Sequence, residues 1–257
     1  MYVFDEVTKI YQSYKGEKQI IGKSLYHLPI YCLTVQKSSY PTLIVQGAMH
    51  AREHITAHLI LRMFEHFLEC GIAGRVHFIP IVNPDGVNYC ENFNRLYKAN
   101  GRGVDLNVNF PAKWGKGDKN VLVPGTENYI GEFPLSEPES SCLCSFSLKE
   151  KPNMTISYHS KGEEIYWEFG QKGIRRKKHK ELAEIAQNLT GYKVKLTKGS
   201  CGGYKDWCIQ ELKIPALTIE VGSDELIHPI GEEFTDAIFE KNRNLLNGII
   251  SYFLEKK

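Results

Sequence analysis

Four side chains of this sequence are of types suited to metal-assisted hydrolysis. His50 and Glu53 are three residues apart, directly after an apolar segment, and His159 follows a second apolar segment. Two imidazoles and a carboxylate are donors that zinc prefers, and a catalytic zinc site needs three protein ligands and a position for water. Glu220 interrupts a third apolar run, where an unpaired carboxylate is costly. It is therefore a further candidate functional residue at a strand end.

The segment that contains His50 also permits a second metal-ligand pattern. His50 and His54 match the HxxEH spacing, in which both histidines bind zinc from one helix and Glu53 is the base. His50 closely follows a buried strand, so we expect it to precede the helix and His54 to be structural. A histidine without a metal is the common case in a chain with nine histidines. The HxxE spacing alone is therefore not specific.

Strands that alternate with helices are expected to position these residues. Apolar runs predict strands at 30–35, 42–46, 76–82, 154–158 and 216–220. Periodic segments predict helices at 4–14, 55–70, 178–189 and 234–253, and a further helix that begins at 136–139. Residues 83–86 predict a turn and 98–138 a long functional loop region. This order favours an α/β protein with a largely parallel or mixed sheet covered on both faces, in which functional residues gather at strand ends.

Composition limits the class of protein. The chain has 257 residues without a repeat or linker, which predicts one domain over 1–257, and 42% hydrophobic residues exclude intrinsic disorder. A net charge of +2 makes nucleic acid an unexpected partner, and no segment is long and apolar enough for a membrane span. The start of the chain lacks the features of a secretory signal, and seven irregularly spaced cysteines indicate no disulfide framework. We expect a cytoplasmic protein.

Six motifs, in order, resemble the zinc carboxypeptidases of the carboxypeptidase A type (the M14 family), and within it the bacterial γ-D-glutamyl-diaminopimelate peptidases. The motifs are Gly47-Ala-Met-His-Ala-Arg-Glu53, Asn83-Pro-Asp-Gly86, Gly103-Val-Asp-Leu-Asn107, His159-Ser-Lys-Gly-Glu-Glu-Ile-Tyr-Trp167, Gly203-Tyr-Lys-Asp-Trp207 and Thr218-Ile-Glu-Val-Gly222. The resemblance implies a three-layer α/β/α fold with a mixed, mostly eight-stranded sheet. It also implies one zinc ion per chain, held by His50, Glu53 and His159, with Glu220 as the general base.

The resemblance implies further site residues. Arg52 is similar to the family's substrate-binding arginine, and Asn107 ends the Asp-Leu-Asn run as a substrate-binding residue. The arginine that stabilises the oxyanion falls on Lys98, which can still place a positive charge near the tetrahedral oxygen. Lys98 lacks the planar fork of an arginine.

Two positions depart from the family pattern. The arginine that clamps the substrate's terminal carboxylate is replaced by Val108, and the mobile tyrosine that covers the substrate falls on Lys198. Tyr204 is a candidate to supply the missing tyrosine. These departures argue against an ordinary C-terminal carboxypeptidase.

Charged residues near the expected substrate pocket point to the cell-wall branch. Lys205 aligns with the base of the pocket on the leaving-group side, where a cation selects an acidic group; a solvated loop lysine is the alternative. Glu163 and Glu164 could meet the amino group of diaminopimelate or orient a metal ligand, and the sequence leaves this choice open.

The function implied by the resemblance is a zinc peptidase that hydrolyses the γ-D-glutamyl–meso-diaminopimelate bond of peptidoglycan stem peptides. It would act on recycled muropeptides or in a developing spore. An ordinary metallocarboxypeptidase or an N-acyl amino acid deacylase of the same fold is an alternative, and so is a non-catalytic peptidoglycan-binding relative. Retention of the metal ligands and of Glu220 argues against a pure binding protein.

Overall fold

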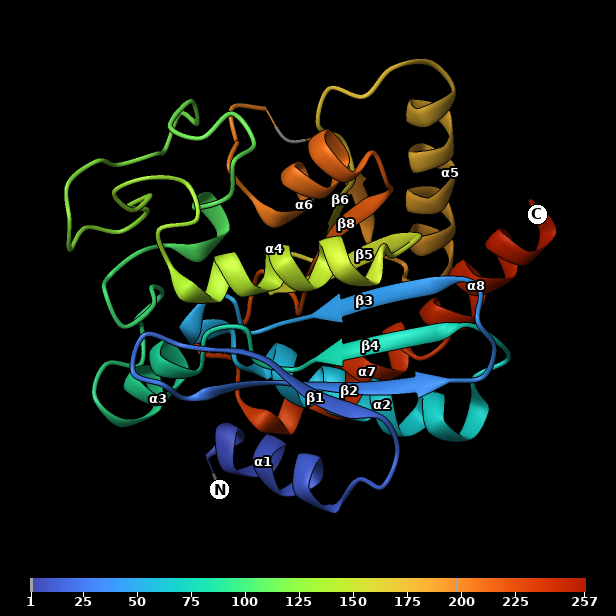
Figure 1. Cartoon of the computed structure of the whole chain (residues 1–257), viewed down its shortest axis with the longest axis horizontal. Helices are drawn as coiled ribbons and strands as arrows, with labels where there is room; N and C mark the ends of the chain where they lie inside the picture. Colours follow the sequence, from blue (N-terminus) through green and yellow to red (C-terminus); the bar gives the residue numbers. More distant parts are fainter. Residues whose placement is uncertain (1, 197) are drawn as a thin grey trace.

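A computed structural model describes residues 2–196 and 198–257. Within these residues, eight strands form one mixed sheet in the order β1-β2-β4-β3-β5-β8-β6-β7 (Figure 1). The strands are β1 (Lys18–Lys23), β2 (Pro29–Gln36), β3 (Thr42–Gln46), β4 (Arg75–Ile79), β5 (Met154–Ser160), β6 (Glu164–Tyr166), β7 (Lys193–Lys195) and β8 (Ala216–Val221). The expected mixed, eight-stranded sheet is confirmed.

The centre of the sheet is parallel. β3 pairs in parallel with both β4 and β5, and β5 pairs in parallel with β8, whereas β1, β2 and β4 are joined by antiparallel pairing. In the β5 and β8 pair, His159 lies directly opposite Glu220. Because neighbouring parallel strands end at the same edge, the residues that follow β3 and those at the ends of β5 and β8 are brought together there.

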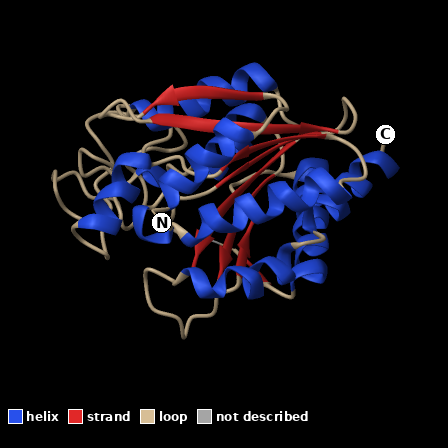
Figure 2. Cartoon of the chain, turned by 90° about the horizontal axis from the view of Figure 1, so that it is seen from below, coloured by secondary structure: helices blue, strands red, loops and turns tan. Residues whose placement is uncertain are grey.

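Helices cover both faces of the sheet (Figure 2). Successive strand residues point to opposite faces, so Leu43 and Val45 belong to one hydrophobic cluster and Ile44 to the other. The first cluster includes α1 (Val3–Ser13), α2 (Ile55–Cys70), α5 (Gly173–Thr190), α7 (Thr235–Asn242) and α8 (Leu245–Glu255). The second includes α4 (Pro138–Glu150) and α6 (Tyr204–Trp207). The fold is thus three layers, α/β/α.

Several elements differ from the sequence-based expectation. Residues 83–86, predicted as a turn, begin helix α3 (Pro84–Asn92), because Asn83 Oδ1 accepts a hydrogen bond from Gly86 N at 2.9 Å and Pro84 occupies the first turn. The single helix predicted at 234–253 is divided into α7 and α8. The amide of Asn242, at the end of α7, is buried and hydrogen-bonds the hydroxyl groups of Tyr158 and Tyr192. β1, β6, β7 and α6 were not predicted.

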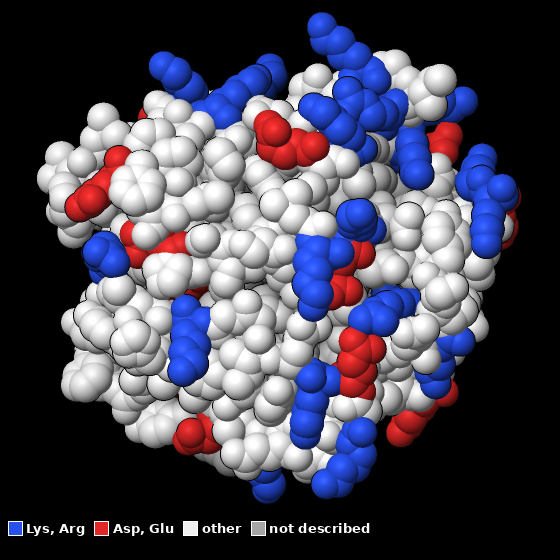
Figure 3. Space-filling model, viewed as in Figure 1, with Lys and Arg blue, Asp and Glu red and all other residues white. Residues whose placement is uncertain are grey.

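The surface carries charges of both signs. On the face shown in Figure 3, lysines and arginines are interspersed with carboxylates, and basic side chains gather at the upper right. This distribution agrees with the net charge of +2. Among the helices described here, none is both long and apolar enough to cross a membrane.

Candidate metal and catalytic site

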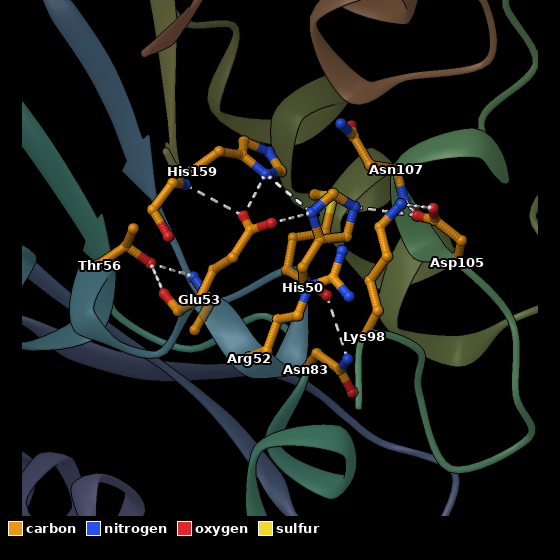
Figure 4. A network of polar contacts seen from close by, with 12 residues as sticks. His50, Arg52, Glu53, Thr56, Asn83, Lys98, Asp105, Asn107 and His159 are labelled. Atoms are coloured by element: carbon orange, nitrogen blue, oxygen red, sulfur yellow. Dashed lines mark hydrogen bonds and ion pairs between the residues drawn. The ribbon is translucent and has the colours of Figure 1, made fainter. Parts of the chain in front are cut away.

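The three predicted metal ligands converge at the edge where the central strands end (Figure 4). His50 Nδ1 lies 2.8 Å from Glu53 Oε1, His159 Nδ1 lies 2.9 Å from Glu53 Oε2, and the two Nδ1 atoms are 3.2 Å apart. All three side chains are buried. His54, the second ligand of the alternative HxxEH pattern, is not in this group and precedes helix α2. The geometry therefore favours the ligand set His50, Glu53 and His159.

A short turn between β3 and α2 places two of these ligands on the same side. His50 precedes the 3₁₀ turn η1 (Ala51–Glu53), and α2 begins two residues after Glu53. Thr56 Oγ1 donates to Glu53 O at 2.8 Å and accepts from Ala48 N at 2.7 Å, which ties the turn to the helix. A Cβ at Gly47 would lie 2.8 Å from Thr56 Oγ1, so the close approach of loop and helix requires glycine.

Asp105 orients the first histidine ligand. Its Oδ1 lies 3.0 Å from His50 Nε2, and its Oδ2 lies 2.6 Å from Lys98 Nζ (Figure 4). When Nε2–H donates to this carboxylate, Nδ1 keeps its lone pair for a metal. The sequence pattern contained Asp105 but gave it no role, because it is 55 residues from His50 along the chain.

The three ligands His50, Glu53 and His159, which we call the triad, form an electrostatic environment that suits a cation. Burial alone would lower the pKa of His50, but Glu53 and Asp105 raise it to about 9. Burial would raise the pKa of Glu53, yet His50 and His159 hold it well below its usual range. Burial lowers the pKa of His159. This donor set fits zinc. It comprises two imidazole nitrogens and a carboxylate that face one another in a buried site, and a second carboxylate orients one of the histidines.

Glu220 lies beside the triad on β8. Burial raises the pKa of this carboxyl group to about 8, and the negative charge of Glu53 contributes to the rise. A metal ion bound by the triad would oppose this shift. Glu220 also lines the main pocket, so its carboxylate can reach a water or substrate held there.

A pocket of about 450 Å³ extends from the triad edge. Among the predicted site residues, its lining contains His50, Lys98, Asn107, Lys205 and Glu220. Lys98 Nζ is paired with Asp105 and also donates to Asn128 Oδ1 at 2.7 Å. The wall is tightly packed: Gly202 has φ +85°, and a Cβ there would lie 2.8 Å from Val108 O.

Lys205 is a buried pocket residue and not a solvated loop lysine. Its Nζ donates to Glu168 O at 3.0 Å, contacts the carboxylate of Asp206, and lies 5.6 Å from the centroid of the Phe169 ring. The residue is 7% exposed. Asp206 was not singled out from the sequence, although it directly follows Lys205. An ammonium group and a carboxylate therefore lie side by side in the pocket.

Three predicted substrate-binding residues are not part of the pocket lining, namely Arg52, Glu164 and Tyr204. Arg52 lies near the triad but pairs with Glu127 at 3.0 Å. Glu164 contacts the hydroxyl of Tyr166 and pairs with Lys195 at 3.4 Å, so Tyr166 and not Glu164 lines the pocket.

Tyr204 does not replace the missing tyrosine in this structure. Its side chain is fully buried, and its hydroxyl lies 2.7 Å from Ser147 Oγ. The ring packs against Phe110 and Trp207 in the layer formed by α4 and α6. The first turn of α6 points Tyr204 into the core while the next residue, Lys205, lines the pocket.

Two histidines, one glutamate and a neighbouring, partly buried carboxylate lie at the central strand ends of an α/β/α sheet, and this arrangement defines a metallohydrolase site. The sequence matches the M14 peptidase family, described as zinc carboxypeptidase, over residues 8–237, and the chain belongs to this family. Together with the triad, this membership confirms the expected zinc cofactor.

Curated relatives include the γ-D-glutamyl-L-diamino acid endopeptidase 1 of Lysinibacillus sphaericus, which is 30% identical over 86% of this chain and 64% of its own length. Human carboxypeptidase B2 is 28% identical over 70% of this chain and 48% of its own length. The chain thus spans less than two thirds of either relative.

Solved structures share the fold. Bovine thrombin-activatable fibrinolysis inhibitor superimposes with a TM-score of 0.86 at 22% identity, covering 99% of this chain and 95% of that chain. Murein-tripeptide amidase MpaA from Escherichia coli O157 gives a TM-score of 0.69 at 23% identity, covering 93% of this chain and 94% of that chain. At these identities the likeness concerns the fold.

Proposed function

We propose that this chain is a zinc-dependent peptidase that hydrolyses the γ-D-glutamyl–meso-diaminopimelate bond of peptidoglycan stem peptides. In this proposal residues 1–257 act as one catalytic domain. The observation that carries the proposal is the buried Lys205, paired with Asp206, in the pocket that also contains Glu220 and a metal ligand. The Lysinibacillus relative, named as a γ-D-glutamyl-L-diamino acid endopeptidase, supports the same bond class.

The site residues divide the chemistry among them. His50, Glu53 and His159 would hold zinc, which when bound would act as a Lewis acid and lower the pKa of a water molecule toward about 7. Glu220 accepts the proton and returns it to the leaving amine. Lys98, held by Asp105, provides positive charge close to the reacting carbonyl.

The pocket residues match the leaving group. The far end of diaminopimelate carries a carboxylate and an ammonium group on one carbon. Lys205 and Asp206 present the opposite pair, an ammonium beside a carboxylate, and both line the pocket. A buried charge without a partner is strongly disfavoured, and Lys205 and Asp206 are partners for one another in the pocket.

The test compares two substrates in the wild-type protein and in Lys205→Met. L-Ala-γ-D-Glu-meso-diaminopimelate has the distal carboxylate, whereas L-Ala-γ-D-Glu-L-Lys lacks it. A hydrogen bond to a charged group contributes on the order of 1.5–3 kcal/mol, so we expect the first substrate to be preferred by roughly 10–100-fold in kcat/KM. Lys205→Met should remove most of this preference by slowing only the first substrate.

Two variants serve as controls. Lys180→Met removes an exposed lysine of α5 and should leave the preference unchanged. Glu220→Gln should retain zinc but lose at least about 10²-fold in kcat on both substrates. An unchanged preference in Lys205→Met would remove the specificity argument. Cleavage of simple N-acyl dipeptides in place of the γ-D-glutamyl bond would favour an ordinary carboxypeptidase, and zinc binding without any turnover would favour a binding protein.

The place of action is a separate part of the proposal. Action on recycled muropeptides inside the cell, or inside a developing spore, remains a prediction from the sequence. Fractionation of the source cells, with detection of the protein in each fraction, would test it.

A further inference from the structure

A second group of side chains of metal-binding types lies apart from the catalytic pocket. Glu6 of α1, His58 of α2 and Glu232 of the 3₁₀ turn η4 (Glu232–Phe234) each offer one ligand atom, and these atoms all lie within 4.8 Å of one another. The three residues neither belong to the triad nor line the pocket. We call Glu6, His58 and Glu232 the peripheral group.

His58 is the centre of the peripheral group. Its Nδ1 lies 2.9 Å from Glu6 Oε2, and the residue is 7% exposed. A hydrogen bond with His58 lowers the pKa of the Glu6 carboxyl group, so this group is ionised at neutral pH. A buried imidazole nitrogen and a carboxylate oxygen are thus already as close to one another as two ligands of one metal ion.

The peripheral group carries more negative charge than one histidine can balance. Glu232 brings a second carboxylate within 4.8 Å of the ligand atom of Glu6. Across residues 2–196 and 198–257, no lysine or arginine forms an ion pair with either carboxylate. Two like charges at this distance repel one another, and a divalent cation between them turns the repulsion into attraction.

A neighbouring carboxyl group has an oxygen without a partner. Glu91, in α3, accepts a hydrogen bond from Val3 N at 3.1 Å through Oε1. Its Oε2 is buried and has no hydrogen-bond partner in the part of the chain that the structure describes. Burial raises the pKa of Glu91, and His58 is near enough to oppose this rise. Glu91 Oε2 is therefore available to a water molecule bound to an ion at the peripheral group.

We propose that the peripheral group binds a second zinc ion, in addition to the ion expected at the triad. One imidazole nitrogen and two carboxylate oxygens are zinc donors, and water would complete a four-coordinate site. The ion would join α1, α2 and η4, whose ligands Glu6 and Glu232 are far apart along the chain. These segments meet only in the folded chain, so the ion would stabilise the fold. This inference does not depend on the substrate proposed above.

The two sites should differ in affinity. The triad is buried, and Asp105 orients one of its histidines, which strengthens metal binding. In the peripheral group, Glu232 is exposed and Glu6 is partly exposed, so water screens their attraction for a cation. We therefore expect the triad to fill first and the peripheral group to fill at higher free zinc.

Equilibrium dialysis against buffered free zinc tests the peripheral site on the full chain. Bound metal is first removed with a chelator, and the protein is then dialysed against rising concentrations of free zinc. Elemental mass spectrometry measures the zinc bound per chain. We expect two zinc ions per wild-type chain at saturation and one per chain in Glu232→Ala and in His58→Gln.

A neighbouring residue provides the matched control. Glu233 is also exposed and lies in the same turn, but it is not part of the peripheral group. Glu233→Ala should therefore still bind two zinc ions. Glu232 is exposed, so Glu232→Ala removes a ligand without disturbing the core and remains informative should His58→Gln fail to fold. Peptidase activity with the triad filled should be the same in Glu232→Ala and in wild type.

The zinc count decides the proposal. Loss of one ion in Glu232→Ala, with two ions retained in Glu233→Ala, would support the peripheral site. A single zinc ion in the saturated wild-type protein would overturn it. A second ion that persists in Glu232→Ala would also overturn it, because that ion would lie elsewhere. Failure of the proposed function would appear separately, as an uncleaved γ-D-glutamyl substrate, and would leave the zinc count unchanged.

Discussion

At the scale of single residues, the site depends on what holds each ligand as much as on the ligands. His50 can offer Nδ1 toward the triad because Nε2 faces Asp105 at 3.0 Å. The same carboxylate holds Lys98 at 2.6 Å. One aspartate therefore orients a metal ligand and the cation proposed to stabilise the oxyanion.

Asp105→Asn should weaken zinc binding. Loss of a carboxylate partner behind a metal-bound histidine typically costs 10–100-fold in metal affinity, and an amide can also stabilise the wrong ring tautomer. Competition with a chelator of known affinity measures the change. Glu127→Gln, on the exposed partner of Arg52, is the control and should bind zinc normally. Equal affinities in Asp105→Asn and wild type would contradict the orienting role.

At the scale of elements, the loops around the site are held by buried polar groups near the start of α4. Glu139, in the first turn of α4, is fully buried and accepts hydrogen bonds from Leu25 N at 3.2 Å and Asn100 Nδ2 at 3.2 Å. Burial raises the pKa of this carboxyl group to about 6. Helix α4 is thus joined to two distant loops through a carboxyl group whose pKa is raised by burial.

The raised pKa of Glu139 predicts a pH-dependent stability. A carboxyl group whose folded pKa exceeds its unfolded value, about 4.5, stabilises the fold at low pH, and this contribution is lost as the pH rises through about 6. The difference of about 1.5 units corresponds to about 2 kcal/mol. We therefore expect the stability of Glu139→Gln relative to wild type to increase by about 1.5 kcal/mol between pH 4.5 and pH 7. Urea unfolding at several pH values measures it.

The control for this prediction is Glu132→Gln, which changes an exposed carboxylate in the preceding loop. Its stability relative to wild type should change little over the same range. If the difference in stability between Glu139→Gln and wild type did not change with pH, the buried carboxyl group would ionise in the folded state without a loss of stability.

At the scale of the whole molecule, the triad joins distant parts of the chain. His159 is more than 100 residues from both His50 and Glu53, and Glu220 lies still further along, on the neighbouring strand β8. Only the folded chain brings these side chains together. A metal ion can therefore bind to this group in the folded chain and not in the unfolded one. Metal binding therefore contributes to the free energy of unfolding.

Zinc should raise the melting temperature of the metal-free protein. A ligand at a thousandfold excess over its Kd contributes about 4 kcal/mol, which corresponds to an increase in Tm of several degrees for a chain of this size. Scanning calorimetry before and after chelation, and after zinc is restored, measures this increase. In His159→Ala the increase should be largely lost, whereas in His54→Ala it should persist. The reverse result would favour the HxxEH pattern.

The sequence by itself determined much of the central sheet and the candidate metal ligands. β3 was predicted with its observed bounds, and the positions of His50, His159 and Glu220 followed from apolar runs that end in polar residues. These signals are local: a buried strand needs a continuous apolar run, and a catalytic group follows it where the chain leaves the core. Short elements such as β6 and β7 lack enough residues for a periodic signal.

Only the tertiary structure decided which polar side chains meet. Tyr204 and Lys205 are neighbours in the sequence, yet the first turn of α6 directs one into the core and the other into the pocket. Asp105 reaches His50 across a long separation that no local pattern encodes. The physical reason is that a side chain's burial and charge partners depend on how distant segments pack, whereas apolar periodicity depends on the segment alone.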